Sequence, residues 1–559
     1  MRPFHALIAS LACLIPAPIC AVPVAAGDPQ VLMSPEPLKA HMAFLADDLL
    51  EGREAGSRGD KLTQLYISNA FRAAGLQPAG DQGGYLQRFR MRSATLDLPS
   101  VRFEISNGGR AQQFANGESV LVFADPIEAD QRIDDVPLVF AGYGIRALEL
   151  GIDDYRGLDV RGKVVVVLGG PPPFMPSAEA AHFGSTEQQR ITAGDHGAIG
   201  LIQLWTPALE QRAAFVHQRR SLGRRDVAWI APDGRPMISA PGVRLRAIAN
   251  GAASDAILAG GRATTAQLLE EARTHSPRGF PLPGRVSLAR RTVHDESLHS
   301  ANVAGLLRGS DPSLADEVVV LTAHHDHIGI GAPVKGDSIY NGALDNGVGV
   351  SMLIEVARAI AASPQRPRRP ILFLAVAAEE KGLIGSDYFA AHPTIDRSKI
   401  AANINLDGAF PFYDFSDVIA FGADHSQLGE HLATAAGEMG LTVAPDPFPE
   451  EGIFTRSDQY SFVKKGIPAV FLYNGFTDLA GRNVGRAVWD DLIVRIVHEP
   501  GDDMSQPIDY DIVAKFGDVF RRLTLVTANA PHRPLWYGDS LFARRFAPQA
   551  ATAQRPRSK

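Results

Sequence analysis

Short apolar runs and amphipathic stretches alternate along the second half of the chain. The apolar runs predict strands at 317–323, 371–377, 401–406 and 468–473. Between and after them, apolar residues recur every three or four positions and predict helices at 346–361, 383–391, 425–439 and 508–528. Since strands that alternate with helices usually form a mostly parallel sheet covered on both faces, this half predicts an α/β fold.

The first half has a different pattern. Residues 36–76 have helical periodicity, whereas residues 85–122 contain short alternating runs that are typical of strands. Short buried strands separated by Gly and Pro are then predicted at 136–140, 164–168 and 199–204. Residues 256–295 read as a helical, Pro-rich return to the α/β pattern. We therefore expect a β-rich unit inserted into the α/β fold.

The N-terminus has the layout of a secretory signal peptide. Arg2 precedes an apolar run, Leu7 to Ala21, and small residues continue to Ala26, so we predict a signal peptide at 1–26. Both cysteines, Cys13 and Cys20, lie inside it. A lipid anchor on Cys20 is the rival interpretation, although the preceding isoleucine fits such a site poorly. A mature chain without cysteine would have to bind metal through His, Asp and Glu.

Size and charge narrow the class of protein further. A chain of 559 residues is too long for one ordinary core. The net charge of −7 gives no electrostatic reason to expect nucleic acid or an anionic membrane as a partner. After residue 26 no stretch reaches the ~18 apolar residues of a membrane helix. We expect an exported protein, periplasmic or secreted, with no membrane contact after cleavage.

Residues suited to metal binding follow several of the predicted strands. Ligands of open α/β sheets lie at the carboxyl ends of the strands, and the first of these strands ends at His324 and Asp326. Other acidic or imidazole groups stand at or near later strand ends: Asp345, Glu379, Glu380, Asp407 and His498. This inventory suits two ions that share a carboxylate.

One predicted site is His324, Asp345 and Asp407, and the other is Asp345, Glu380 and His498. Asp345 would bridge two ions about 3.5–4 Å apart. Imidazole and carboxylate ligands without sulfur favour zinc, with cobalt or manganese as substitutes.

The neighbouring residues receive different roles. Glu379 and Glu380 point in opposite directions at a strand end, so Glu380 is assigned to the metal and Glu379 to general base catalysis. Asp326 is placed to orient the imidazole of His324. His325 and His327 are expected not to be ligands; alternation puts His325 on the face opposite His324.

Several blocks resemble peptidase family M28, the co-catalytic zinc peptidases that include secreted bacterial aminopeptidases. They are Thr322–His327, Gly336–Asn346, Ala378–Ser386 and Asn405–Asp407, with Leu50–Gly56 upstream and Arg456–Asp458 and Lys465–Pro468 downstream. The resemblance implies the zinc-exopeptidase (phosphorylase/hydrolase-like) α/β fold, a mixed, mostly parallel sheet flanked by helices. It also implies two zinc ions, with the roles above falling on the same positions. The complete ligand set argues against the family's non-catalytic receptors and single-zinc cyclases.

A second resemblance concerns the inserted unit. Residues 139–145, 154–164 and 197–200 look like parts of a protease-associated domain, a small β-rich module found in secreted peptidases. The expected organisation has five parts, in chain order: a signal peptide at 1–26, an N-terminal catalytic part at 27–125, the insert with its return segment at 126–285, the main catalytic part at 286–530 and a basic tail at 531–559 whose end is disordered.

Together these patterns favour an exported metallo-aminopeptidase that hydrolyses peptides with a water activated by two zinc ions. A carboxypeptidase or dipeptidase on the same centre is an alternative, and Arg456 is the candidate clamp for a substrate carboxylate. A non-catalytic binding protein that uses the inserted module is a further alternative.

Overall fold

Two large hydrophobic cores organise the folded chain. The computed structural model describes residues 33–212, 214–218, 222–223 and 225–556, so the predicted signal peptide and both cysteines lie outside the described residues. The first core is built from residues 33–85 and 303–543, whereas the second is built from residues 94–288 and Leu541. The first core contains the predicted α/β unit.

The sheet of the first core is mixed and mostly parallel. Its strands lie in the order β13-β17-β14-β18-β21-β19-β20. The four central strands are parallel to one another, which confirms the predicted α/β fold. The bounds are β13 (Phe280–Leu307), β17 (Ile371–Val376), β14 (Val318–His324), β18 (Ile400–Leu406), β21 (Ala469–Asn474), β19 (Asp417–Phe421) and β20 (Thr442–Val443).

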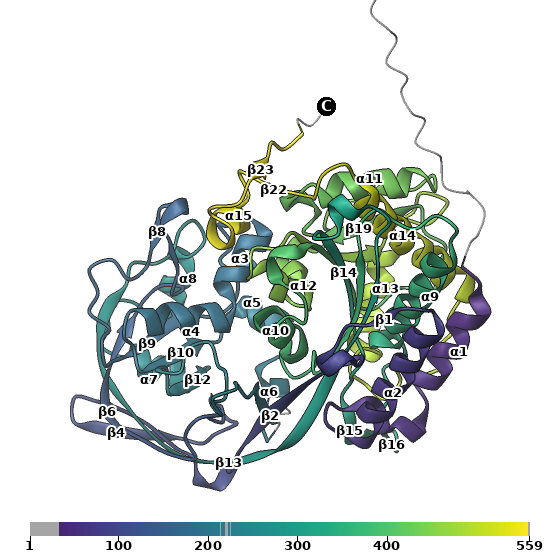
Figure 1. Cartoon of the computed structure of the whole chain (residues 1–559). Coiled ribbons are helices and arrows are strands. Elements are labelled where there is room, and N and C mark those ends of the chain that lie inside the picture. The colour runs from purple at the N-terminus through teal and green to yellow at the C-terminus, as the bar shows by residue number, and fades with distance from the viewer. Residues whose placement is uncertain (1–32, 213, 219–221, 224, 557–559) are drawn as a thin grey trace, which may run out of the picture. The chain divides into compact units, whose positions relative to one another are not determined.

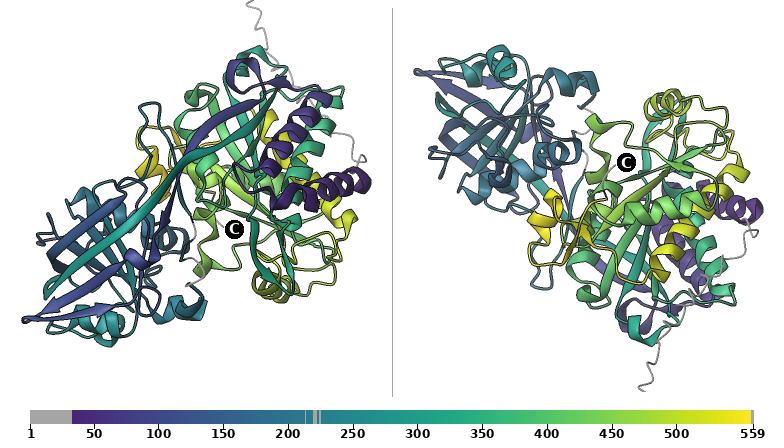
Figure 2. Two further views of the ribbon diagram at one scale, coloured as in Figure 1. Left: turned by 90° about the horizontal axis from the view of Figure 1, so that it is seen from below. Right: turned by 90° about the horizontal axis from the view of Figure 1, so that it is seen from above.

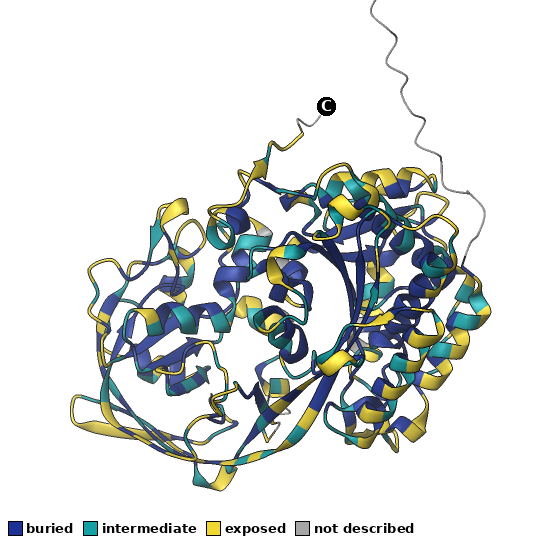
Figure 3. Cartoon of the chain, in the orientation of Figure 1, coloured by how far each residue is buried: buried dark blue, intermediate teal, exposed yellow. Residues whose placement is uncertain are grey.

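Helices cover both faces of this sheet (Figure 1). On one face α9 (Val348–Ala362) packs against β14 and against α1 (Pro35–Leu45), α2 (Arg58–Ala73) and α14 (Tyr510–Asn529). Because α9 is apolar on nearly every side, it is buried between the sheet and these helices (Figure 3). On the other face lie α10 (Ile384–Ala391) and α12 (Gln459–Val463). A further helix, α11 (Leu428–Gly437), packs against α14.

The second core surrounds a separate sheet that shares strand β13. Its strands lie in the order β4-β3-β13-β6-β9-β10-β12-β5. The bounds are β3 (Arg102–Asn107), β4 (Arg110–Phe114), β5 (Val120–Val122), β6 (Asp130–Phe140), β9 (Val164–Leu168), β10 (Gly200–Leu204) and β12 (Leu245–Ala249). Helices α4 (Thr186–Asp195), α7 (Ala252–Leu258) and α8 (Thr265–Glu271) belong to the same region.

The predicted boundary at residue 126 is too late. Ala94, Leu96, Phe103, Ile105 and Val122 are buried in the second core. Their strands pair with β13 and β12 of the second sheet, so the segment contributes to that core and not to the catalytic one. We therefore use "the insert" below for residues 94–288.

Strand β13 connects the two sheets. Its first half pairs with β3 and β6 in the insert, its second half pairs with β17 in the first core, and β2 (Leu86–Leu96) runs antiparallel to it in between. The left view of Figure 2 shows this long strand passing from one sheet to the other. Because β13 is hydrogen-bonded to strands of both sheets, it joins the insert to the first core.

The tail predicted at 531–559 is folded up to residue 556. Trp536 and Phe542 are buried in the first core and Leu541 in the second, so apolar side chains anchor a segment whose composition is basic. It forms β22 (Trp536–Tyr537), α15 (Leu541–Phe546) and β23 (Thr552–Ala553). Disorder was predicted only for the end of this tail, and residues 557–559 lie outside the described range.

The remaining elements are short. They are β1 (Gln77–Pro78), β7 (Arg146–Ala147), β8 (Ile152–Asp153), α3 (Ser177–Gly184), α5 (Pro207–Arg212), α6 (Phe215–Gln218), β11 (Asp226–Trp229), β15 (Gly329–Val334), β16 (Asp337–Tyr340) and α13 (Gly485–Arg495). Among the described residues, no helix has the length and apolar character that crossing a membrane requires.

Candidate metal centre

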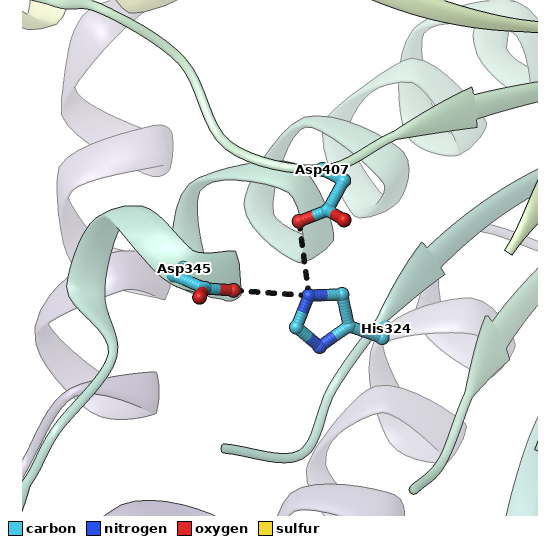
Figure 4. A group of neighbouring side chains, drawn as sticks. All are labelled: His324, Asp345 and Asp407. Atoms are coloured by element: carbon cyan, nitrogen blue, oxygen red, sulfur yellow. Dashed lines mark hydrogen bonds and ion pairs between the residues drawn. The ribbon is translucent and has the colours of Figure 1, made fainter. Parts of the chain in front are cut away.

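Two strand ends and one turn bring the first group of ligand atoms together. His324 is the last residue of β14, and Asp407 follows β18 directly. Nε2 of His324 lies 3.1 Å from Oδ1 of Asp345 and 3.1 Å from Oδ1 of Asp407. Figure 4 shows both carboxylates pointing at this one nitrogen. The structure thus assembles the first predicted site.

The second group lies on the other side of Asp345. Nε2 of His498 lies 3.1 Å from Oδ2 of Asp345 and 3.2 Å from Oε2 of Glu380. Asp345 therefore directs one oxygen to His324 and the other to His498. This is the arrangement required of a carboxylate that bridges two ions.

His327 lies closer to the second group than the sequence predicts. Its Nδ1 is 2.9 Å from Oε1 of Glu380, an ion-pair contact. With Asp345 and Glu380, His327 forms a group whose ligand atoms all lie within 4.8 Å of one another. It is a further candidate ligand, missed because strand alternation ends at His324. His325 lies near Asp60 and Ala301, away from both groups.

These residues fit divalent metal ions. Buried polar atoms normally have hydrogen-bond partners, yet Nε2 of His327 has none among the described residues. Nitrogen and carboxylate oxygen are the donors that zinc takes in the absence of sulfur. Burial alone would lower the pKa of His324, but Asp407 and Asp345 raise it well above its ordinary value. The carboxylates thus favour a positive charge at this place, either a proton on the imidazole or a metal ion.

Asp502 holds the bridging residue in place. Its carboxylate accepts hydrogen bonds from the backbone N–H groups of Leu344 (2.7 Å) and Asp345 (2.9 Å). Burial raises the pKa of Asp502 to about 6. The turn also needs Gly342, since a side chain there would collide with the carbonyl of Asp345 and the ring of His327. Sequence reasoning missed this role for Asp502, although its place four residues after His498 was a signal.

Arg53 braces the same loops from the N-terminal segment. Its buried guanidinium donates to the carbonyl oxygens of Asn341 (2.5 Å), Gly342 (3.0 Å) and His325 (3.0 Å). Burial lowers the pKa of Arg53 to about 10, while nearby carboxylates, first Asp502, oppose that shift. The block 50–56 thus positions the loops on either side of the ligands.

Glu379 lies beside the ligands without joining either group. Burial raises its pKa well above the ordinary value, and the negative charges of Asp407, Glu380 and Asp458 add to the effect. The backbone N–H of Glu379 donates to Oδ1 of Asp326 at 3.0 Å. A carboxyl group that lies beside the ligands but belongs to neither group is placed to take up and release a proton.

Asp326 acts differently from the prediction. Its carboxylate lies 3.8 Å from Nδ1 of His324, beyond hydrogen-bond distance, whereas its backbone carbonyl lies 3.2 Å from that nitrogen. The carbonyl therefore orients the imidazole, and the carboxylate instead holds the backbone of Glu379. One residue links the first metal-ligand group to the predicted base.

The loop 456–458 divides into two parts. Nη1 of Arg456 lies 3.2 Å from a carboxylate oxygen of Glu451, and its side chain is 54% exposed. Asp458 is fully buried, neither of its carboxylate oxygens has a hydrogen-bond partner in the described chain, and burial raises its pKa to about 7. Asp458 therefore contributes charge next to Glu379, while Arg456 is paired with another acid.

Part of the chain matches the model of a known protein family. Residues 302–524 match the model of Peptidase family M28. This M28-matching segment contains every predicted ligand as well as Glu379 and Asp326.

Two curated relatives resemble parts of the chain. Aminopeptidase YwaD from Bacillus subtilis is 31% identical over 112 residues, which are 20% of this chain and 22% of that protein. Leupeptin-inactivating enzyme 1 from Streptomyces exfoliatus is 29% identical over 217 residues, which are 36% of this chain and 44% of the relative. The aligned part of the chain thus covers less than half the length of either relative.

Solved structures align over longer stretches at lower identity. The aminopeptidase from Aneurinibacillus sp. strain AM-1 aligns with a TM-score of 0.48 at 17% identity, covering 88% of this chain and 93% of the other. BSAP, a zinc aminopeptidase from Bacillus subtilis, aligns with a TM-score of 0.43 at 18% identity, covering 89% and 95%.

Proposed function

We propose that the chain is an exported metallo-aminopeptidase that removes N-terminal residues from peptides at a two-zinc centre. The observation that carries this proposal is the position of Asp345. Its Oδ1 lies 3.1 Å from His324 Nε2, and its Oδ2 lies 3.1 Å from His498 Nε2. The match of residues 302–524 to Peptidase family M28, with relatives named as aminopeptidases, supports peptide hydrolysis as the reaction.

The ligands divide into two sets that share Asp345. His324, Asp345 and Asp407 would hold one zinc ion, and Asp345, Glu380 and His498 the other, with His327 as an additional nitrogen near Glu380. Zinc in these positions supplies Lewis acidity, which polarises a peptide carbonyl and makes water more acidic.

Glu379 is the proposed proton carrier. Its carboxylate would accept a proton from the attacking water and donate it to the nitrogen of the leaving amine. Asp326 fixes the backbone of Glu379 through the 3.0 Å hydrogen bond to its N–H, which limits the positions that the carboxylate can take. The negative charge of Asp458 raises the pKa of Glu379 and so favours proton uptake by that carboxylate.

Export and the inserted module belong to the same proposal. We infer that residues 1–26 are removed as a signal peptide and that the insert is a protease-associated module. The sheet of the insert, with its short parallel strands, supports that assignment. N-terminal sequencing of the chain purified from the periplasm or medium should begin near residue 22 or 27. A chain that keeps Met1 would contradict export by this route.

A matched set of peptides tests the specificity. The same tripeptide would be supplied with both termini free, with an acetylated N-terminus, or with an amidated C-terminus. We expect cleavage of the free and amidated peptides from the N-terminus, and none of the acetylated peptide. Cleavage of only those peptides that have a free C-terminus would instead indicate a carboxypeptidase. Failure of the zinc-loaded protein to cleave any of a peptide library would favour a binding protein.

A further inference from the structure

The insert contains a cavity of about 360 Å³ that shares no residue with the candidate metal centre. Three arginines line it: Arg190 from α4, Arg225 just before β11, and Arg246 from β12. Asp226 is the one carboxylate among the lining residues. The cavity is therefore rich in positive charge, although the protein as a whole is acidic, with a net charge of −7.

Arg190 is the unusual member of this group. Its Nε is buried, and the side chain forms no hydrogen bond or ion pair with any residue that the structure describes. A guanidinium keeps its charge at all ordinary pH values, so it cannot escape the cost of burial by losing a proton. An unpaired buried donor of this kind costs free energy until a partner is supplied.

The neighbouring carboxylates do not supply that partner. Burial lowers the pKa of Arg190, and repulsion by Arg246 lowers it further, against the attraction of three acids. Each acid is already bonded to another group. Asp226 is paired with Arg246 at 2.5 Å, Asp125 with Arg290 at 3.1 Å, and Glu187 with the hydroxyl of Ser239.

Arg225 offers a second free cation at the same cavity. It is exposed and, in the part of the chain that the structure describes, it has no hydrogen bond or ion pair. The lining of the cavity also includes apolar side chains, those of Phe123, Leu201 and Ile248. The lining thus combines cations that suit negative charge with apolar side chains that suit a hydrocarbon group.

We propose that this cavity binds a small organic anion, a carboxylate or phosphate group carried on an apolar body. The planar guanidinium of Arg190 presents paired N–H donors that match either group, and the anion would satisfy the buried charge. The volume is near the lower end of small-molecule sites, which limits the ligand to a compact one. Binding here is independent of peptide hydrolysis, so its failure would leave the proposed function untouched.

The test is calorimetric titration of the full-length zinc-loaded protein with three matched probes. They are 3-phenylpropionate, phenyl phosphate and the uncharged 3-phenylpropanamide. Inorganic phosphate serves as a competitor and shows whether the apolar body is needed. We expect saturable binding of at least one anion and none of the amide. Equal binding of amide and acid, or no binding of either anion at millimolar concentration, would overturn the proposal.

Variants locate the site. Arg190→Gln should weaken anion binding about ten- to a hundredfold, because it removes a charge-assisted pair. Arg235→Gln is the matched control, since Arg235 is exposed and paired with Asp233 in the same region. Should Arg190→Gln fail to fold, Arg225→Gln, a change of an exposed side chain, should still weaken binding severalfold. Unchanged affinity in Arg225→Gln and in a folded Arg190→Gln would place the ligand elsewhere and overturn the proposal.

Discussion

The first core and the insert gather side chains of different charge: acids and histidines in the first core, arginines in the insert. In the first core, acidic and imidazole side chains face one another at the ends of adjacent parallel strands, as at His324 and Asp407, 3.1 Å apart. In the insert, Arg190 and Arg225 line a cavity with no acid bonded to either among the described residues. The first arrangement requires cations, whereas the second requires an anion. Residues at strand ends are visible in a sequence, but an arginine without a partner is visible only after folding.

The largest expected effect separates chemistry from metal binding within the first core. Glu379→Gln should lower kcat by about 10²–10⁴-fold, since a proton carrier is lost while the metal ligands stay in place. Peptide turnover and zinc content would be measured on the same sample. Glu438→Gln is the control, because the side chain of Glu438 is 47% exposed and pairs with Arg522, outside both ligand groups. A Glu379→Gln protein with full activity would remove Glu379 from the mechanism.

The next prediction concerns the C-terminal segment, which contributes buried side chains to both cores. Phe542 is fully buried in the first core, and its neighbour Leu541 is buried in the second. Phe542→Ala should cost about 3–5 kcal/mol of unfolding free energy, as expected for a buried aromatic ring. Denaturant unfolding would be compared with that of Leu479→Ala, where the side chain is 66% exposed. Equal stability of the two variants would show that the C-terminal segment does not join the cores.

A smaller effect is expected at the residue that supports the bridging carboxylate. Asp502→Asn leaves one acceptor where two backbone N–H groups now donate, so Asp345 should lose part of its alignment. We expect zinc affinity to fall about 10–100-fold. The adjacent Asp503→Asn is the matched control, because the carboxylate of Asp503 accepts from the N–H of Ser505. Competition with a zinc chelator would give both affinities, and identical values would refute the supporting role.

The smallest effect is a pH dependence at the contact between the insert and the first core. His182 of α3 forms a hydrogen bond with the hydroxyl of Tyr460 of α12, and burial lowers the pKa of His182 from 6.5 to about 3. The unfolded chain takes up a proton near pH 6.5 and the folded chain resists it, so stability should fall as the pH drops below 6.5. The loss should be about 2 kcal/mol at about pH 5.

The control for this pH effect is His182→Gln, which cannot take up the proton. Urea unfolding of both proteins at several pH values would be compared. The difference in their stability should change between neutral pH and about pH 5. A constant difference over that range would show that His182 does not remain neutral in the folded chain.

The sequence was informative where local pattern and strand order decide the outcome. The central strands and helices were predicted to within a few residues. In the structure five of the predicted side chains lie near one another: His324, Asp345, Glu380, Asp407 and His498. What stayed hidden depends on loop geometry and on long-range packing. His327 turns toward Glu380 only because the strand has ended, and the carboxylate of Asp326 reaches the backbone of Glu379 instead of His324.

The domain organisation shows the same limit. Residues 94–124 alternate in a manner compatible with either core, and only pairing with β13 assigns them to the insert. The basic composition of 531–559 concealed Trp536, Leu541 and Phe542, which anchor that segment to buried surfaces. Such assignments depend on partners distant in sequence, which neither composition nor periodicity identifies.

The most direct test of the central claim is the number of zinc ions bound by three proteins, measured by elemental analysis after purification. Two ligand sets that share Asp345 predict two ions per parent chain. His324→Ala and His498→Ala should each lose one ion, because each removes a ligand from one set. A parent chain that is fully active with one ion or none, or variants that each keep the parent's full complement, would contradict the account.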